Sequence, residues 1–183
     1  MEINNLISER WSPVAFSDKQ IDIQVINALF EAARWAPSGF NGQPWRFIWG
    51  TKGDQTYEQL FELISESNKK WAVTAPILIL SMAETIPAGR TNINKYAFFE
   101  TGMAVSNLLL QATYAGLYAH QMGGYDSLKA KDILNLPESI EPATMIAVGY
   151  KGNPEDLPEE IGIRETKLRS RKELDTFVFN KGF

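Results

Sequence analysis

The sequence predicts one globular domain of mixed α and β structure. Its 183 residues are enough to bury a substantial core within a single domain. Apolar residues recur at helical spacing between positions 26 and 33. In contrast, the apolar run at positions 75–82 has the length and continuity of a buried strand. We therefore expect helices packed against a sheet, in one domain that spans residues 1–183.

The composition excludes several classes of function. The chain has no cysteine and a single histidine, His120, which removes disulfides, thiol catalysis and Cys/His zinc sites. A Ser–His arrangement would have to use that one residue. Only an all-carboxylate metal site stays open, and the acidic residues lack the spacing of an EF-hand, so we expect no metal. With a net charge of −4, neither nucleic acid nor an anionic membrane is an expected partner.

The N-terminal segment does not have the pattern of a targeting signal. Residues 1–12 contain no basic region followed by an apolar run. Nowhere does the chain reach 18 consecutive apolar residues. A soluble cytoplasmic protein is therefore the default expectation.

The first predicted helix leads into a segment of turn-forming residues. Ser17 and Gln20 have the spacing of a capping box, and the apolar positions 26–33 then define one buried face. Pro37 should end this helix, because its ring forbids continuation and disfavours helical geometry at the preceding residue. Taken alone, residues 36–44, "APSGFNGQP", are a helix stop followed by a turn.

Strand and helix patterns alternate in the next part of the chain. Residues 45–49, "WRFIW", predict a strand, and the apolar spacing within residues 55–67 predicts a helix. The apolar run at 75–82 predicts a central strand. A loop is expected at 85–95, where Pro, Gly, Asn and Thr gather.

Residues 95–119 form the longest helical pattern. They are apolar on nearly every side, which predicts a helix of about 25 residues, roughly 37 Å long, that is buried all round. A chain of this size encloses such a helix with difficulty, so we interpret its small-residue face as a subunit interface. A central core helix in a monomer is the alternative.

The last third of the chain predicts fewer elements. Residues 123–137 suggest a turn and a short helix, and residues 143–152, "ATMIAVGYKG", a third strand closed by glycine. After a polar stretch, the apolar side chains of residues 174–180, "LDTFVFN", are typical of a last strand or a docking arm. No internal repeat or interdomain linker is visible.

The chemistry points to an organic cofactor. Without thiol, metal or triad candidates, an enzyme of this composition would delegate the difficult step to a cofactor and supply binding and orientation. Neither the dinucleotide nor the P-loop fingerprint is present. A phosphate could instead be held by Arg10 with Ser12 and by Arg169 with Arg171, although each group taken alone is also typical of solvated surface charge.

Five motifs together resemble the FMN-dependent nitroreductase family. They are "ERWSPVAFSDKQI", "EAARWAPSGFNGQPWRFIWG", "NKKWAVTAPILIL", "HQMGGYD" and "LRSRKELDTFV", in the family's order and spacing, and they cover residues 10–179. The resemblance implies an α+β, nitroreductase-like sandwich with a mostly antiparallel central sheet flanked by helices. It also implies an intertwined homodimer with two FMN sites at the interface.

The resemblance assigns FMN-binding residues in four groups. The phosphate and the adjoining part of the cofactor would be held by Arg10, Trp11, Ser12, Arg169 and Arg171. A loop reaching the flavin of the other subunit would contain Pro37, Ser38, Gly39 and Asn41, anchored by Gln43 and Pro44. Asn68 would bind the pyrimidine side of the ring. A turn near its face and edge would contain Met122, Gly123 and Gly124, where glycine permits close approach of the backbone.

Two positions depart from common family residues. Where many relatives have a lysine near the flavin, this chain has Trp71, and Lys69 or Lys70 would have to substitute. Where some relatives have a glutamate, it has Gly123.

Other residues near these motifs have two interpretations. His120 is either a proton donor or, as is commoner for a lone histidine at the end of an element, a packing or capping residue. Phe40, Tyr96 and Phe99 either line a substrate pocket or belong to the core.

The resemblance implies an oxidoreductase whose catalysis takes place on FMN, with no protein residue assigned as catalytic. NAD(P)H would donate hydride to flavin N5 in a ping-pong reaction, and a small-molecule acceptor such as a nitroaromatic or a quinone would take the electrons. Reductive dehalogenation and flavin cleavage on the same fold are alternatives. So is an FMN-binding protein without turnover.

Overall fold

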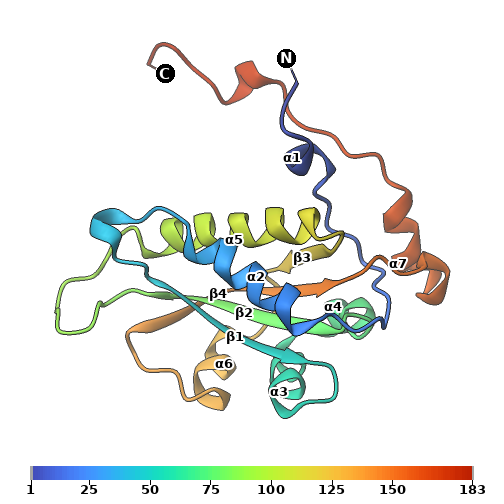
Figure 1. Cartoon of the computed structure of the whole chain (residues 1–183), viewed down its shortest axis with the longest axis horizontal. Coiled ribbons are helices and arrows are strands. Elements are labelled where there is room, and N and C mark those ends of the chain that lie inside the picture. The colour runs from blue at the N-terminus through green and yellow to red at the C-terminus, as the bar shows by residue number, and fades with distance from the viewer. Residues whose placement is uncertain (1, 183) are drawn as a thin grey trace.

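A four-stranded antiparallel sheet forms the middle layer of the molecule (Figure 1). The computed structural model of the chain describes residues 2–182. The strands lie in the order β1-β2-β4-β3. Their bounds are Trp45–Thr51 for β1, Ile77–Glu84 for β2, Tyr118–Met122 for β3 and Ile140–Gly149 for β4. The predicted strands at 45–49, 75–82 and 143–152 are confirmed, and β2 is central as expected.

Helices cover both faces of this sheet. Ile77 and Ile79 of β2 pack into one core cluster, whereas Leu78 and Leu80 pack into the other, as the two-residue period of a strand requires. The first face is covered by α2 (Ile23–Arg34) and α5 (Ala97–Tyr114), and the second by α3 (Gln55–Leu63), α4 (Glu66–Ala72) and α6 (Ser127–Ile133). The expected α+β sandwich with an antiparallel sheet is therefore confirmed.

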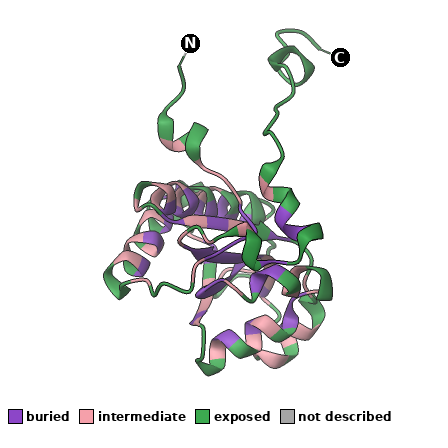
Figure 2. Cartoon of the chain, turned by 90° about the vertical axis from the view of Figure 1, so that its right-hand side faces the viewer, coloured by how far each residue is buried: buried purple, intermediate pink, exposed green. Residues whose placement is uncertain are grey.

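Both ends of the chain extend away from the sandwich (Figures 1 and 2). They contain α1 (Asn5–Glu9) and the stretch that follows α7 (Glu159–Gly162). Every residue from 167 to 182 is exposed, and the only regular structure there is a 3₁₀ turn at Leu174–Thr176. The apolar residues 174–180 thus form an arm and not a strand. No helix in residues 2–182 combines the length and apolar character that crossing a bilayer requires.

The start of α2 differs from the prediction. The expected capping box of Ser17 and Gln20 is wrong, because the backbone N–H of Ser17 donates to Tyr150 O at 2.9 Å and keeps the chain extended there. The helix begins later, where Asp22 Oδ1 accepts the N–H of Gln24 at 2.7 Å.

The long helical pattern at 95–119 contains a helix and a strand. Gly116 adopts a left-handed φ of 70°, and the N–H of Leu117 donates to Ala112 O at 2.8 Å, which closes a Schellman motif after Tyr114. The following residues form β3, which the sequence prediction missed. The prediction that this helix is buried all round is wrong within one chain, because α5 exposes the large apolar residues Phe98, Phe99 and Tyr114.

The predicted helix at 55–67 is interrupted. Ile64 forms an isolated antiparallel β-bridge with Tyr125, and the N–H of Ser65 donates to Gly124 O at 2.9 Å. These contacts pull the backbone out of helical geometry, so that α3 ends at Leu63 and α4 begins at Glu66.

Candidate functional site

Arg169 fixes the end of α1 against the C-terminal extension. Its Nη1 donates to Arg10 O at 2.9 Å and its Nη2 donates to Ser8 O at 2.7 Å. Arg10 in turn donates from Nη1 to Ser12 Oγ at 3.1 Å. Two groups that the sequence separates by about 160 residues are therefore neighbours, as the predicted phosphate site requires.

Positive charge gathers around Arg10. Burial is the largest cause that lowers the pKa of Arg10, and the nearby charges of Arg171 and Arg169 lower it further. Within residues 2–182, none of these three guanidinium groups forms an ion pair. Three neighbouring guanidinium groups, none of them in an ion pair, are an arrangement suited to an anion with several oxygen acceptors.

Trp11 is held between an aromatic ring and a cation. Its ring packs edge-on against Tyr118, with centroids 6.3 Å apart, and the Nζ of Lys151 lies 4.4 Å from the Trp11 ring centroid. These contacts set the position of the residue between Arg10 and Ser12.

Two side chains that sequence analysis did not assign to binding anchor the next part of this segment. His120 Nδ1 lies 2.7 Å from Pro13 O, and because a carbonyl can only accept, Nδ1 carries the proton. The N–H groups of Val14 and Ala15 both donate to Oε1 of Glu165, the latter at 3.3 Å. Glu165 lies in a polar, charged stretch, so no sequence pattern distinguishes it.

Asn68 and Gly124, predicted to approach the same ring, are in contact. Asn68 Nδ2 donates to Gly124 O at 3.2 Å, and Asn68 Oδ1 accepts from Trp71 Nε1, also at 3.2 Å. Trp71 is completely buried, and its indole N–H fixes the position of the Asn68 side-chain amide. Its role in this chain is therefore structural.

Neither neighbouring lysine has an unpaired ammonium group. Lys69 Nζ lies 2.8 Å from Glu66 Oε1, and Lys70 Nζ lies 3.7 Å from Glu160 Oε1. A role for Lys69 or Lys70 in place of the missing family lysine would therefore require an ion pair to break.

The two glycines of the turn after β3 have different surroundings. A Cβ on Gly124 would lie 2.7 Å from Asn68 Nδ2 and 2.8 Å from Ser65 Oγ, whereas a Cβ on Gly123 would meet no heavy atom within 4 Å. Both glycines are exposed, and their N–H groups donate to no acceptor in the described residues. They are available to a ligand.

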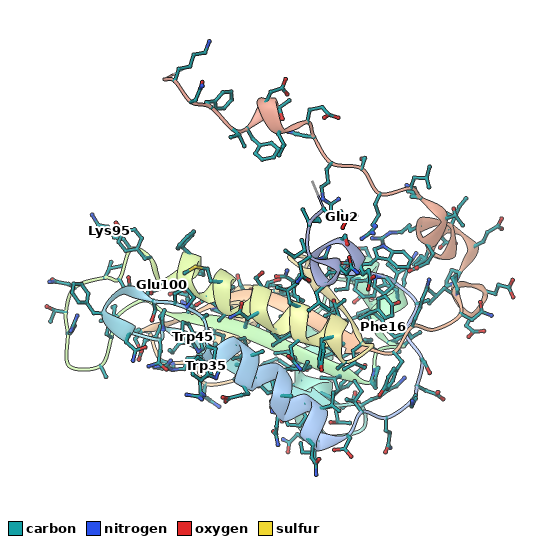
Figure 3. The ribbon with its side chains drawn as sticks, turned by 45° about the horizontal axis from the view of Figure 1, so that its top comes forward. Glu2, Phe16, Trp35, Trp45, Lys95 and Glu100 are labelled. Carbon is teal, nitrogen blue, oxygen red and sulfur yellow. The ribbon has the colours of Figure 1, made fainter. Side chains whose placement is uncertain are left out.

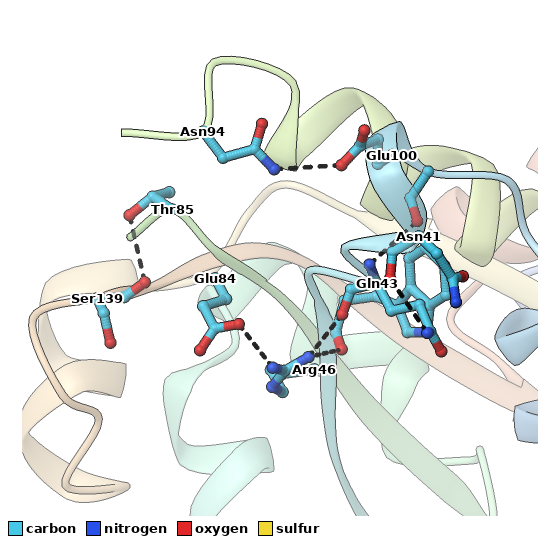
Figure 4. A network of polar contacts seen from close by, with 10 residues as sticks. Asn41, Gln43, Arg46, Glu84, Thr85, Asn94, Glu100 and Ser139 are labelled. Carbon is cyan, nitrogen blue, oxygen red and sulfur yellow. Dashed lines mark hydrogen bonds and ion pairs between the residues drawn. The ribbon is translucent and has the colours of Figure 1, made fainter. Parts of the chain in front are cut away.

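The loop at 37–43 has a constrained backbone. Three of its non-glycine residues have left-handed φ values, namely Phe40 at 51°, Asn41 at 56° and Gln43 at 46°. Ser38 Oγ accepts the N–H of Gln43 at 3.0 Å, and Arg46 Nη1 donates to Gln43 O at 2.8 Å (Figure 4). Gln43 is thus an anchor of the loop.

Glu100 holds the same loop from α5. This carboxylate is buried, and its Oε1 accepts the N–H of Gly39 at 2.7 Å while its Oε2 accepts from Asn94 Nδ2 at 3.2 Å. Figure 4 shows the contact with Asn94, which belongs to the 85–95 loop. Sequence analysis missed Glu100, because it occurs in a predominantly apolar helix.

The structure does not bring the 37–43 loop near the other predicted groups of the same chain. The loop and Glu100 lie at one end of the sheet, and the segment around Phe16 lies at the other (Figures 1 and 3). The interpretation as core residues is wrong for Phe40, Tyr96 and Phe99, because all three side chains are exposed.

Comparison with known proteins places this geometry in a family. Residues 7–73 and 51–150 match the sequence profile of the nitroreductase family. The chain belongs to the nitroreductase family. A solved structure described as an oxidoreductase containing FMN has a TM-score of 0.94 and 30% identity, over 100% of this chain and 93% of that one.

Two further relatives differ in their described activities. A protein of Archaeoglobus fulgidus named "Putative NADH dehydrogenase/NAD(P)H nitroreductase" is 26% identical over 86% of this chain and 90% of its own length. An iodotyrosine deiodinase of Haliscomenobacter hydrossis is 26% identical over 79% of this chain and 77% of its own length.

Proposed function

We propose that this nitroreductase-family protein is an FMN-dependent oxidoreductase that uses NAD(P)H to reduce nitroaromatics, quinones or related electrophiles. The observation that carries the proposal is the cluster of Arg10, Arg169 and Arg171, none of which forms an ion pair within residues 2–182. FMN brings a phosphate with close to two negative charges, which such a cluster can neutralise. The described activities of the relatives supply the reaction class.

The residues present fit FMN at the ring end as well. Gly123 and Gly124 expose backbone N–H groups with no acceptor in the described residues, so that they can donate to ring atoms. Asn68 keeps one amide hydrogen and one lone pair beyond its contacts with Gly124 and Trp71. A planar, polar-edged ring is the kind of ligand that these groups recognise.

The chemical step belongs to the cofactor, and the chain supplies orientation. When bound, FMN would accept hydride at N5 from NAD(P)H and pass the electrons to the acceptor in a ping-pong cycle. Arg10, Ser12 and Arg171 would hold the phosphate. Asn68 and the glycine turn would fix the ring.

We also propose that the active unit is a homodimer. The 37–43 loop and the N-terminal segment that leads to Phe16 lie at opposite ends of the sheet of one chain (Figures 1 and 3), and a second copy would bring the loop to the arginine cluster. Large apolar side chains are exposed on α5 and at its start, namely Tyr96, Phe98, Phe99 and Tyr114, and along the C-terminal extension, namely Leu168, Leu174, Phe177 and Val178. Exposed apolar patches of this extent are typical of subunit interfaces.

The test is a titration of purified protein with FMN, followed by addition of NADH or NADPH. We expect a yellow protein whose absorbance bleaches under anaerobic conditions and recovers on adding a nitroaromatic or a quinone. Protein that refuses added FMN contradicts the proposal. If bound FMN is reduced no faster than free FMN, the protein stores or senses flavin and does not turn over.

Reductive dehalogenation is a second candidate, favoured by the similarity to iodotyrosine deiodinase. The same FMN-loaded protein can be offered a halogenated phenol in place of the nitroaromatic. Release of halide with consumption of NAD(P)H, and slower turnover of nitroaromatics, would favour this candidate over the first.

A further inference from the structure

His120 lies at the junction between the two parts of the proposed FMN site. It occupies β3, directly before the turn that contains Gly123 and Gly124. On the other side, its Nδ1–H donates to Pro13 O at 2.7 Å, and Pro13 follows the predicted phosphate ligand Ser12. One side chain thus contacts the phosphate segment from the strand that leads into the ring-side turn.

Trp71 extends this connection to Asn68. Its ring stacks on the His120 ring with centroids 4.4 Å apart and an interplanar angle of 29°, and it packs at 6.3 Å against Phe16. The Trp71 indole N–H donates to Asn68 Oδ1, and Asn68 Nδ2 donates to Gly124 O. The series from Pro13 to Gly124 therefore consists of direct contacts throughout.

The middle of the connection is buried. Trp71 is completely buried, and Pro13 is buried as well. The hydrogen bonds of His120 with Pro13 and of Trp71 with Asn68 are partly buried, so the loss of either leaves a poorly solvated polar group, whereas the bond from Asn68 to Gly124 lies at the exposed end of the series. Glu165 and Thr74 also anchor the N-terminal segment, at Val14–Ala15 and at Phe16, but neither has a hydrogen bond to the glycine turn.

We propose that His120 and Trp71 are positioning residues that order the phosphate segment and the ring-side turn as one unit. The proposal rests on the proposed function for its ligand, FMN, but the coupling itself is a property of the chain. A substitution that increases the mobility of the phosphate segment should therefore also increase the mobility of the ring-side turn, and the reverse should hold. FMN would then lose affinity although no residue that contacts it has changed.

Two substitutions at position 120 separate the two contacts of the imidazole. His120→Asn retains an amide donor near the place of Nδ1 but lacks the ring that stacks on Trp71. His120→Phe retains a stacking ring but cannot donate to Pro13 O. Trp71→Phe removes the donor to Asn68 while leaving an aromatic ring beside His120.

Tyr57→Phe is the matched control. Tyr57 is buried in the same core cluster, and its hydroxyl donates to Ala75 O at 2.9 Å and lies 3.5 Å from Ala72 O, with no hydrogen bond to Pro13, His120, Asn68 or the glycine turn. The Tyr57→Phe variant therefore loses a buried hydrogen bond to a backbone carbonyl, as His120→Phe does, but keeps every hydrogen bond between Pro13 and Gly124. General loss of core stability should be similar in the control and in the site variants.

The first measurement is hydrogen exchange of the protein without FMN. We expect Trp71→Phe to speed amide exchange at Val14 and Ala15, and His120→Phe to speed it in residues 123–125, beyond the change in Tyr57→Phe. If each variant loosens only the contacts at its own position, the coupling is overturned. This readout stands even if the wild-type protein does not bind FMN, which would instead refute the proposed function.

The second measurement is FMN affinity at neutral pH. We expect His120→Phe and Trp71→Phe each to weaken binding roughly tenfold, the effect of about one lost hydrogen bond, with Tyr57→Phe unchanged. His120→Asn should recover part of the loss of His120→Phe. Wild-type affinity in both His120→Phe and Trp71→Phe, or an equal loss in the control, contradicts the proposal.

Discussion

The buried carboxylate of Glu100 accepts the backbone N–H of Gly39 at 2.7 Å, joining α5 to a loop 61 residues earlier in the chain. Three left-handed non-glycine residues follow within this loop. Their conformations are costly, typically about 1 kcal/mol or more each, and persist only where surrounding contacts fix them. Glu100 is one of those contacts, and Asn94 shares its other oxygen.

Replacing Glu100 by alanine should therefore free the loop. We expect a loss of about 1.5 to 3 kcal/mol in the free energy of unfolding, because a charge-assisted hydrogen bond is removed and the Gly39 N–H is left unsatisfied. Glu100→Gln retains an acceptor and should lose less. Denaturant unfolding gives the free energies, and faster proteolysis at residues 38–43 identifies the loop. Equal stability of the alanine variant and the wild type would contradict this role.

Adding a methyl group should discriminate between the two adjacent glycines. Gly124→Ala places a Cβ against Asn68 and Ser65, so we expect about 1 to 3 kcal/mol of destabilisation and weaker FMN binding. Gly123→Ala meets open space and should leave the melting temperature nearly unchanged. Thermal unfolding and FMN titration of both variants check the prediction, which fails if the two behave alike.

The arginine cluster should determine FMN retention. Arg10→Ala and Arg171→Ala are each expected to weaken FMN binding roughly 10- to 100-fold, the range for one charge-assisted contact, with the fold intact. Lysine at the same positions restores the positive charge but lacks the planar, bidentate donor set of a guanidinium, so it should recover only part of the lost FMN affinity. Fluorescence titration with FMN at two salt concentrations measures this. Unchanged affinity in both alanine variants would show that the phosphate binds elsewhere.

Arg169→Ala should act differently, through the backbone. Its guanidinium is occupied by Ser8 O and Arg10 O, so its removal should also speed hydrogen exchange around residues 8–12.

His120 should make folding stability depend on pH. Burial, the largest cause, lowers the pKa of His120; the charges of Arg164 and Arg10 act in the same direction, while the Pro13 hydrogen bond and Glu165 oppose them. Below the ordinary imidazole pKa of about 6.5, the unfolded chain binds more protons than the folded one. This contribution to stability is therefore complete above that pH and is lost as the pH falls toward the folded-state pKa.

Because His120 is the only histidine, the test is direct. Unfolding free energies measured from about pH 7 down to pH 5.5 should fall more steeply for the wild type than for His120→Asn. Parallel profiles would contradict a lowered pKa at this position.

The outer side of α5 should form the proposed dimer interface. Gly102 lies there, exposed, with no heavy atom within 4 Å of its added Cβ. Gly102→Arg should leave the monomer folded but place a charge in the interface, shifting the protein to monomers with weak FMN binding. Light scattering after gel filtration measures the mass, and Glu58→Lys, an exposed charge change on α3 at the other face of the sheet, is the control. A wild-type protein that is already monomeric contradicts the dimer.

The sequence determined most of the secondary structure, because the two-residue period of β1 and the continuous apolar run of β2 are local patterns. It failed where tertiary contacts override local preference. Gly116 ended a pattern that looked continuous, and the bridge between Ile64 and Tyr125 divided a predicted helix. Neither the left-handed glycine nor the long-range bridge has a signature in the apolar spacing.

The candidate site divides in the same way. The family motifs by themselves named Arg10, Asn68 and Gly124, since a motif records residue types at fixed spacing. Only the tertiary structure showed that Glu100 and Glu165 hold the loop and the N-terminal segment, because a carboxylate that binds distant backbone N–H groups has no pattern along the chain. It also decided that Trp71 and His120 connect the two parts of the site, since stacking depends on positions in space that folding alone brings together.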